Sequence, residues 1–186
     1  MSFIEQLFYR IYRLPYLTVL LLIVCAVLLW AALAAAVGKK YLKSWKTVNA
    51  VLLLILLLAI LHYTLLRRTP DAGKQLVLKP FASLKAAKLV DEIYRSLTMN
   101  ILLFFPIGLF LPQLLPGKWK PWQKMLVTVL AGLLFSAGIE TIQYLYKLGD
   151  AETDDTITNV IGTVIGTLHV FLAPGITRFV KKKKAE

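Results

Sequence analysis

The chain is poor in the residues on which disulfide, metal and soluble-enzyme chemistry depends. Its 186 residues include one cysteine, Cys25, inside an apolar run, which excludes a disulfide framework and a cysteine-based metal site. Charged residues make up only 17% of the chain, and apolar residues make up 58% against a usual share of about 45–50%. This balance excludes a disordered chain and argues against a soluble enzyme. We expect a membrane protein without a metal or another cofactor.

Acidic residues are especially scarce, with 10 Asp and Glu against 22 Lys and Arg and a net charge of +12. A protein that binds nucleic acid would gather its positive charge on one folded face. Here the basic residues occur in short blocks between apolar runs, which is the distribution that membrane topology produces. We therefore expect membrane lipids, and no nucleic acid, as partners.

The apolar residues gather into five long runs. A hydrocarbon core about 30 Å thick is crossed by about 20 apolar residues in a helix. The five runs occupy residues 15–38, 48–66, 99–115, 125–146 and 156–174. The first run is longer than the apolar core of a signal peptide, so we expect it to remain as a span. The predicted fold class is all-α, a polytopic membrane helix bundle with about five transmembrane helices, in a single domain over residues 1–186.

Two further segments are predicted to lie along the membrane surface. Apolar residues between positions 3 and 11 follow helical spacing, which predicts an N-terminal interfacial helix, with an untied leader as the alternative. The long connection 67–98 closes with a mixed-charge segment, residues 84–97, that also has the character of a surface helix.

Lysines at the end of the chain set the expected orientation. The run Lys181–Lys184 should stay in the cytoplasm by the positive-inside rule, and the basic segments 39–47 and 116–124 then face the same side. With five spans, the N-terminus and the connection 67–98 lie on the extracytoplasmic side.

Polar side chains enter the apolar runs at a few places. Each charged group in a span costs about 2.5–3.5 kcal/mol on insertion scales, so it requires a reason. The candidate ligand-binding residues are the polar groups near the outer ends of the spans: His62, Asn100, Glu140, Gln143, Asp154, Asp155 and Asn159. At this depth they predict one outward-opening layer, suited to a lipid headgroup or another amphiphile. The inner half of the bundle is expected to be hydrocarbon, apart from His169, which should bond a neighbouring helix.

Small residues beside these polar groups predict close helix packing. Asn159, Gly162 and Gly166 follow one another at helical spacing, and the two glycines form a GxxxG pattern. The residues assigned to helix packing are Pro106, Gly108, Gly132, Ser136, Gly162 and Gly166. Two structural alternatives stay open. Glu140, Gln143 and Asn159 bond one another across helices, or an aspartate at the start of the fifth helix caps it.

Three sequence elements carry a resemblance to a known family. The stretch NILLFFPIGLFLP, residues 100–112, resembles the NxxxFxPxGxxLP signature of the VanZ-like family. Downstream, SAGIETIQ (136–143) is similar to its SxxIExxQ element, and DDTITNVIGTVIG (154–166) to its DDxxxNxxGxxxG element. Order and spacing agree, and the family core is placed at about residues 48–174.

One departure from the family pattern concerns a cation. The family often has GRxFDxDD before the asparagine, whereas this chain has LGDAETDD, with Gly149 in place of the arginine and Glu152 in place of an aspartate. If the arginine pairs with a phosphate or carboxylate, its charge must come from elsewhere, with Lys147, Arg95 and Arg68 as the candidates.

The resemblance implies a multi-pass protein of the bacterial cell (plasma) membrane associated with tolerance to lipoglycopeptide antibiotics, chiefly teicoplanin. It implies no established reaction. Together with the polar layer, it leads us to expect a binding module for a lipid-linked peptidoglycan precursor, its isoprenyl phosphate carrier, or the acyl tail of the glycopeptide antibiotic. The oligomeric state stays open.

Two alternatives compete with the binding module. The first is an intramembrane enzyme acting on a lipid-linked envelope substrate, with Glu140 or Asp155 as acid/base and His62 as helper. Against it, no GxSxG elbow, HExxH or phosphatase-like cluster of Lys, Arg and His occurs. The second is a transporter or scramblase, which lacks support because no internal repeat and no polar path across the inner half are evident.

Overall fold

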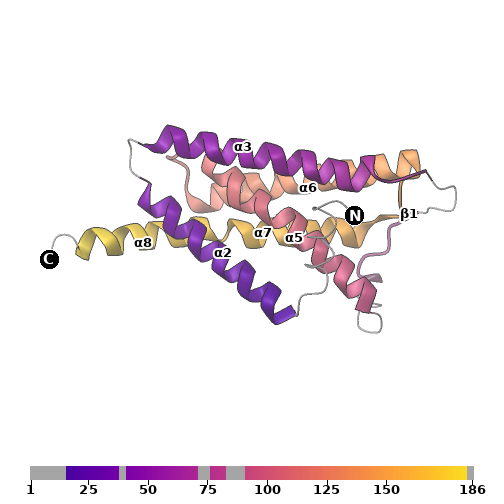
Figure 1. Cartoon of the computed structure of the whole chain (residues 1–186), viewed down its shortest axis with the longest axis horizontal. Helices are drawn as coiled ribbons and strands as arrows, with labels where there is room; N and C mark the ends of the chain where they lie inside the picture. The colour runs from indigo at the N-terminus through magenta and orange to yellow at the C-terminus, as the bar shows by residue number, and fades with distance from the viewer. Residues whose placement is uncertain (1–15, 38–40, 71–75, 83–90, 184–186) are drawn as a thin grey trace.

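The computed structural model describes residues 16–37, 41–70, 76–82 and 91–183. Its elements are α2 (Tyr16–Ala36), α3 (Leu42–Leu61), the π-helical turn η2 (His62–Leu66), β1 (Leu76–Val77), α5 (Asp91–Leu114), α6 (Pro121–Tyr146), β2 (Ala151–Glu152), α7 (Thr153–Thr167) and α8 (His169–Lys183). The protein is therefore a helix bundle, as predicted (Figure 1). The N-terminal interfacial helix predicted from residues 3–11 and the first part of the 84–97 helix lie outside the described residues.

Five helical segments are long and apolar enough to cross a membrane, which confirms the predicted spans. They are Leu17–Ala36, Leu42–Leu66, Ser96–Leu114, Pro121–Tyr146 and Thr153–Phe179. Their outer faces carry exposed leucines, such as Leu21 on α2 and Leu54 on α3, which suits contact with lipid tails. The fifth span is made of two helices, α7 and α8, which meet at Leu168. There the Leu168 N–H bonds back to the Ile165 carbonyl over three residues, which tightens the chain locally.

The third helix is longer than the sequence predicted. Residues 91–97 were expected in a separate surface helix, but they form the first two turns of α5, which continues through Pro106 and Pro112 to Leu114. Pro112 is fully buried, and Pro106 is partly buried. By contrast, α6 starts where its sequence indicates. Pro121 occupies its first turn, and the Gln123 side chain accepts a hydrogen bond from the Lys120 N–H at 2.8 Å.

The centre of the bundle is a crossing of α5 and α7 at backbone distance. A Cβ built on Gly162 would overlap the carbonyl oxygen of Ile101, and one built on Gly108 would overlap the carbonyl oxygen of Thr163. Gly166 lies against Gly108 in the same crossing. The threonines of the fifth span support this packing, since Thr163 is buried and its hydroxyl donates to the Asn159 carbonyl within the helix. The face of α7 that carries these glycines and threonines is therefore packed against other helices and does not contact lipid.

Helix α6 also packs on α7 through small residues. Gly132 is buried, and a Cβ there would press on the side chain of Thr163. Beyond this contact, an apolar cluster joins α3, α5 and α6 around Ile60, Phe104 and Ile139. This packing holds α3, α5 and α6 together beside polar residues such as Gln143 and Asn100.

Among the described residues, the one departure from an all-helical fold is a small parallel sheet of two strands, each two residues long. Leu76 of β1 pairs with Ala151 of β2, and Val77 pairs with Glu152. The pairing ties the connection after α3 to the loop between α6 and α7. In Figure 1 this sheet lies at the end of the bundle opposite to the C-terminal part of α8.

Candidate functional site

An open polar cavity of about 460 Å³ lies at the sheet end of the bundle. Its walls come from the end of the second span, the start of α5, the α6–α7 loop and the first turn of α7. The lining residues are Arg67, Arg68, Thr69, Ser96, Leu148, Gly149, Asp150, Glu152 and Asp155. The cavity therefore offers guanidinium, hydroxyl and carboxylate groups to a ligand, with few apolar contacts.

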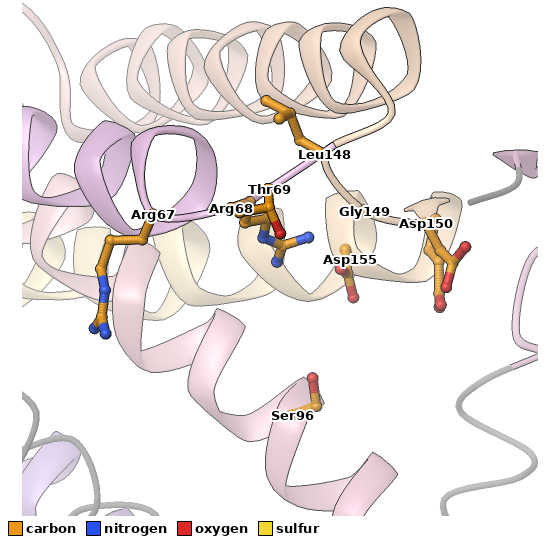
Figure 2. A pocket seen from close by; sticks show the side chains of 9 residues that line it. Arg67, Arg68, Thr69, Ser96, Leu148, Gly149, Asp150 and Asp155 are labelled. Carbon is orange, nitrogen blue, oxygen red and sulfur yellow. The ribbon is translucent and has the colours of Figure 1, made fainter. Parts of the chain in front are cut away.

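The side chain of Arg68 reaches into this cavity. Figure 2 shows its side chain extended toward Asp155 and the loop at Gly149, while the neighbouring Arg67 points the other way. Gly149 is buried, and a Cβ on it would overlap the Nη1 atom of Arg68. Gly149 is the position at which the family pattern carries an arginine. Among the candidate cations whose side chains the structure describes, Arg68 and Lys147, it is therefore Arg68 that lies where a side chain at position 149 would begin.

Arg67 has a different environment from Arg68, although the two residues are adjacent in the sequence. Its guanidinium carbon lies 5.4 Å from the centre of the Tyr63 ring, within the range of a cation–π contact. Both arginines line the cavity, but the side chain of Arg68 extends toward Asp155, whereas that of Arg67 packs on an aromatic ring.

Asp155 is the one predicted ligand-binding residue that lines the cavity directly. It is partly buried on the first turn of α7, and its Oδ1 accepts a hydrogen bond of 2.7 Å from Asn100 Nδ2 on α5. Asn100 thus holds the carboxylate in place from behind. Arg68 lies close enough to interact with Asp155 electrostatically.

Glu140 stands beside Asp155 and secures the loop that forms the cavity wall. Its Oε2 accepts a hydrogen bond of 3.0 Å from the backbone N–H of Glu152. Both Asp155 and Arg68 are within electrostatic range of its carboxylate. A charged cluster consisting of Arg68, Glu140 and Asp155 therefore unites three spans that are distant in sequence.

Asp154 is buried and anchors the long connection rather than facing the cavity. Its Oδ1 accepts a hydrogen bond from the backbone N–H of Phe81, a residue with a left-handed backbone (φ 64°). Thr153 adds a second tie, donating to the Val77 carbonyl at 3.4 Å. The N-cap residue of α7 is Glu152, whose side chain makes no cap hydrogen bond. Asp154 thus has a long-range partner that the capping alternative did not include.

Gln143 and Asn159 bond between helices, although not to each other or to Glu140 as the packing alternative proposed. Gln143 Nε2 donates to the Thr64 carbonyl at 3.0 Å, which joins α6 to η2. Asn159 Nδ2 donates to Ser136 Oγ at 2.9 Å, which joins α7 to α6. Both residues are buried, so these bonds hold the bundle together.

His62 lies apart from the other predicted site residues. It is exposed at the start of η2, and its ring packs edge-on against Tyr63 with 5.8 Å between ring centres. It does not line the cavity.

The expectation of a purely apolar inner half is wrong. At the opposite end of the bundle, Trp45, Gln113 and His169 form a hydrogen-bonded chain across three helices. A second cavity of about 260 Å³ adjoins it and includes Lys124 in its lining. His169 does bond a neighbouring helix, as expected, but it is one member of a larger polar cluster.

Sequence reasoning gave Arg68 only as one of three cations and did not include Ser96, Asp150 and Glu152 as site residues. The sequence feature that could have identified these four residues is their position, since each lies within a few residues of the end of a predicted span or of a motif. Among the described residues, no three His, Cys, Asp or Glu side chains group as a metal site would require.

Comparison with known proteins gives one match. A family model described as VanZ/LLP1 matches residues 18–174, which include the elements that line the cavity and also α2. No curated protein and no solved structure matches the chain significantly.

Proposed function

This chain belongs to the VanZ/LLP1 family, and we propose that it acts in the bacterial cell membrane as a non-enzymatic binding protein for a lipid-linked cell-wall precursor. By holding that precursor, it lowers the access of lipoglycopeptides such as teicoplanin to their target. One observation carries the proposal: a guanidinium and several carboxylates converge in an open cavity at the end of a membrane bundle.

The chemistry of the cavity favours one kind of ligand. A guanidinium binds phosphate oxygens through paired hydrogen bonds, whereas carboxylates accept hydrogen bonds from hydroxyl and ammonium groups. A precursor with a sugar on an isoprenyl diphosphate presents both kinds of group. A bare isoprenyl phosphate would bring only anionic oxygens to Asp150, Glu152 and Asp155. The polar lining also suits a headgroup better than the acyl tail of a drug.

The proposed orientation brings this cavity to the outer leaflet. The lysine-rich end of α8 stays in the cytoplasm by the positive-inside rule, so the sheet end of the bundle is extracytoplasmic. Precursors and glycopeptides meet on that side. A Thr69→Cys variant in a Cys25→Ser background tests this directly, because a membrane-impermeant thiol reagent should label it in intact cells. Labelling only after cell disruption would contradict the orientation.

Resistance measurements test the function. Cells that express Arg68→Gln or Asp155→Asn should lose teicoplanin tolerance while the membrane abundance of the protein stays unchanged. Lys147→Gln is the matched control, since it removes a positive charge at the same end of the bundle from an exposed side chain that does not line the cavity, and it should keep tolerance. If abundance falls in parallel with tolerance, the cavity residues are structural and the proposal fails.

A second candidate function rests on the proximity of Glu140 and Asp155. Two neighbouring carboxylates beside an arginine can serve as acid and base, which favours an enzyme that modifies a lipid-linked envelope substrate. Mass profiling of lipid-linked precursors from expressing cells distinguishes the two. The binding protein predicts an unchanged mass profile, and a new mass lost in Glu140→Gln would establish the enzyme instead.

A further inference from the structure

The polar cluster at the C-terminal end of the bundle has a fixed hydrogen-bond direction. The Trp45 Nε1–H can only donate, and it lies 3.0 Å from Gln113 Oε1. The Gln113 amide nitrogen then donates to His169 Nε2, so Nδ1 carries the hydrogen and donates to the Gly166 carbonyl at 2.8 Å. This chain links α3, α5, α7 and α8. It builds a rigid polar wall inside an otherwise apolar region.

A cavity of about 260 Å³ opens beside this wall. Its lining includes Gln113, His169, Lys124, Trp119 and Thr177. Lys124 is only partly exposed, and the ammonium of Lys46 is close enough to interact with it. Lys46 itself reaches the Leu114 carbonyl at 3.4 Å. Two positive charges thus lie within electrostatic range of each other at this end of the bundle.

These cations have no carboxylate near them in the part of the chain that the structure describes. Every acidic side chain described there, from Glu140 to Asp155, belongs to the sheet end of the bundle. Glu140 follows Lys124 by 16 residues on the same helix, which is about 24 Å. An anion that binds Lys124 would therefore come from outside these residues.

An apolar groove of about 220 Å³ adjoins the same end. It is lined by Trp119, Trp122, Gln123, Leu126 and Val127. Trp119 lines both the groove and the Lys124 cavity. Exposed tryptophans such as Trp122 are typical of the level at which headgroups meet acyl chains. A cationic polar cavity and an apolar groove therefore share one wall.

We propose that this end of the bundle is a binding site for an anionic phospholipid of the adjacent leaflet. The phosphate lies on Lys124 beside the Gln113–His169 wall, and an acyl chain follows the groove along α6. This site is independent of the cavity at Arg68. It fits a lipid better than a free anion, because the groove gives a free anion nothing to contact.

Native mass spectrometry and thermal unfolding of the detergent-purified full chain test this site. Phosphatidylglycerol should remain bound and raise the unfolding temperature, whereas phosphatidylcholine should do neither. Lys124→Gln should weaken the binding about tenfold or more, the usual effect of losing a charged hydrogen bond. The control is Lys118→Gln, a loop lysine at the same end that lines neither cavity, and it should bind as the wild type does.

A second variant keeps the test decisive if Lys124→Gln does not fold. Thr177→Phe leaves the lysine in place and fills the cavity from α8, so it should also abolish phosphatidylglycerol binding. Equal loss in Lys118→Gln and Lys124→Gln would show surface attraction alone and overturn the site. So would unchanged binding by Thr177→Phe. An equal rise in unfolding temperature with inorganic phosphate would overturn the acyl-chain part and leave an anion site.

Discussion

The guanidinium of Arg68 occupies the space that a side chain at Gly149 would enter. The two residues are far apart in sequence, at the end of the second span and in the loop after the fourth. The resemblance to the family leads us to expect an arginine at position 149, and in this chain a positive charge lies beside that position from the segment after the second span. Asp155 and Glu140 lie within electrostatic range of that charge.

Replacing Gly149 with alanine should displace Arg68 without unfolding the protein. The added Cβ meets the flexible end of the arginine rather than backbone, and Gly149 has no positive φ that would exclude alanine. We expect the free energy of unfolding to fall by only about 1 kcal/mol, because Arg68 moves away from the carboxylates of Asp155 and Glu140 while the backbone stays in place. Precursor binding, measured by titration of the purified protein, should weaken at least severalfold.

Gly138→Ala is the control for this change. A Cβ at Gly138 would meet nothing within 4 Å, and alanine inside a helix is favoured by about 0.5–1 kcal/mol. This variant should be slightly more stable and bind normally. Wild-type binding by Gly149→Ala would show that the position of Arg68 does not matter.

Alanine at Gly108 or Gly162 should separate α5 from α7. In both cases the new Cβ would collide with a carbonyl oxygen of the facing helix, which cannot rotate away as a side chain does. Overpacking of this kind costs about 1–3 kcal/mol. Unfolding in detergent should show this loss for both variants, whereas Gly175→Ala, with nothing within 4 Å, should show none. Equal stability of all three would mean that the helices do not cross this closely.

Asn159 should contribute to stability and not to binding. Its amide joins α7 to Ser136 on α6, and its Oδ1 has no partner among the described residues. Interhelical hydrogen bonds in membranes average about 0.6 kcal/mol and reach about 1.7 kcal/mol. A double-mutant cycle of Asn159→Ala and Ser136→Ala should give a coupling energy in this range. Ligand affinity that falls in Asn159→Ala at unchanged stability would place this residue in the site instead.

Asp154 should control the attachment of the connection after α3. Its carboxylate accepts the Phe81 N–H, so Asp154→Ala should speed amide hydrogen exchange at Phe81 and in β1. Asp155→Ala is the matched control, because the neighbouring carboxylate bonds Asn100 and not this connection. Equal exchange in both variants would show that the sheet alone holds the segment.

Hydropathy and spacing predicted the spans and the close helix packing because both depend on local pattern. Runs of about 20 apolar residues lead to membrane-crossing helices, and two glycines four residues apart on α7, Gly162 and Gly166, permit backbone contact. The prediction of a separate helix over residues 84–97 was wrong for residues 91–97, the part that the structure describes. Those residues continue into α5, because a change from charged to apolar composition does not by itself interrupt a helix.

The direction of each polar side chain could not be predicted from its depth. His62, Gln143, Asn159 and Asp155 were assigned to one layer, yet only Asp155 lines the cavity. The level along a helix follows from residue count, whereas the side that faces a ligand depends on which helices are neighbours. For the same reason, the contact between Arg68 and Gly149 required the three-dimensional arrangement.

The most direct test of the Arg68 site is thermal unfolding of the purified protein during titration with a disaccharide-bearing isoprenyl diphosphate precursor. A ligand that binds only the folded state stabilises it by about 2.7 kcal/mol at a hundredfold excess over Kd. Isoprenyl phosphate, teicoplanin and vancomycin serve as comparison ligands. We predict that the precursor raises the unfolding temperature of the wild type and of Lys147→Gln but not of Arg68→Gln. No rise with the precursor, or the same rise in Arg68→Gln, would contradict the account.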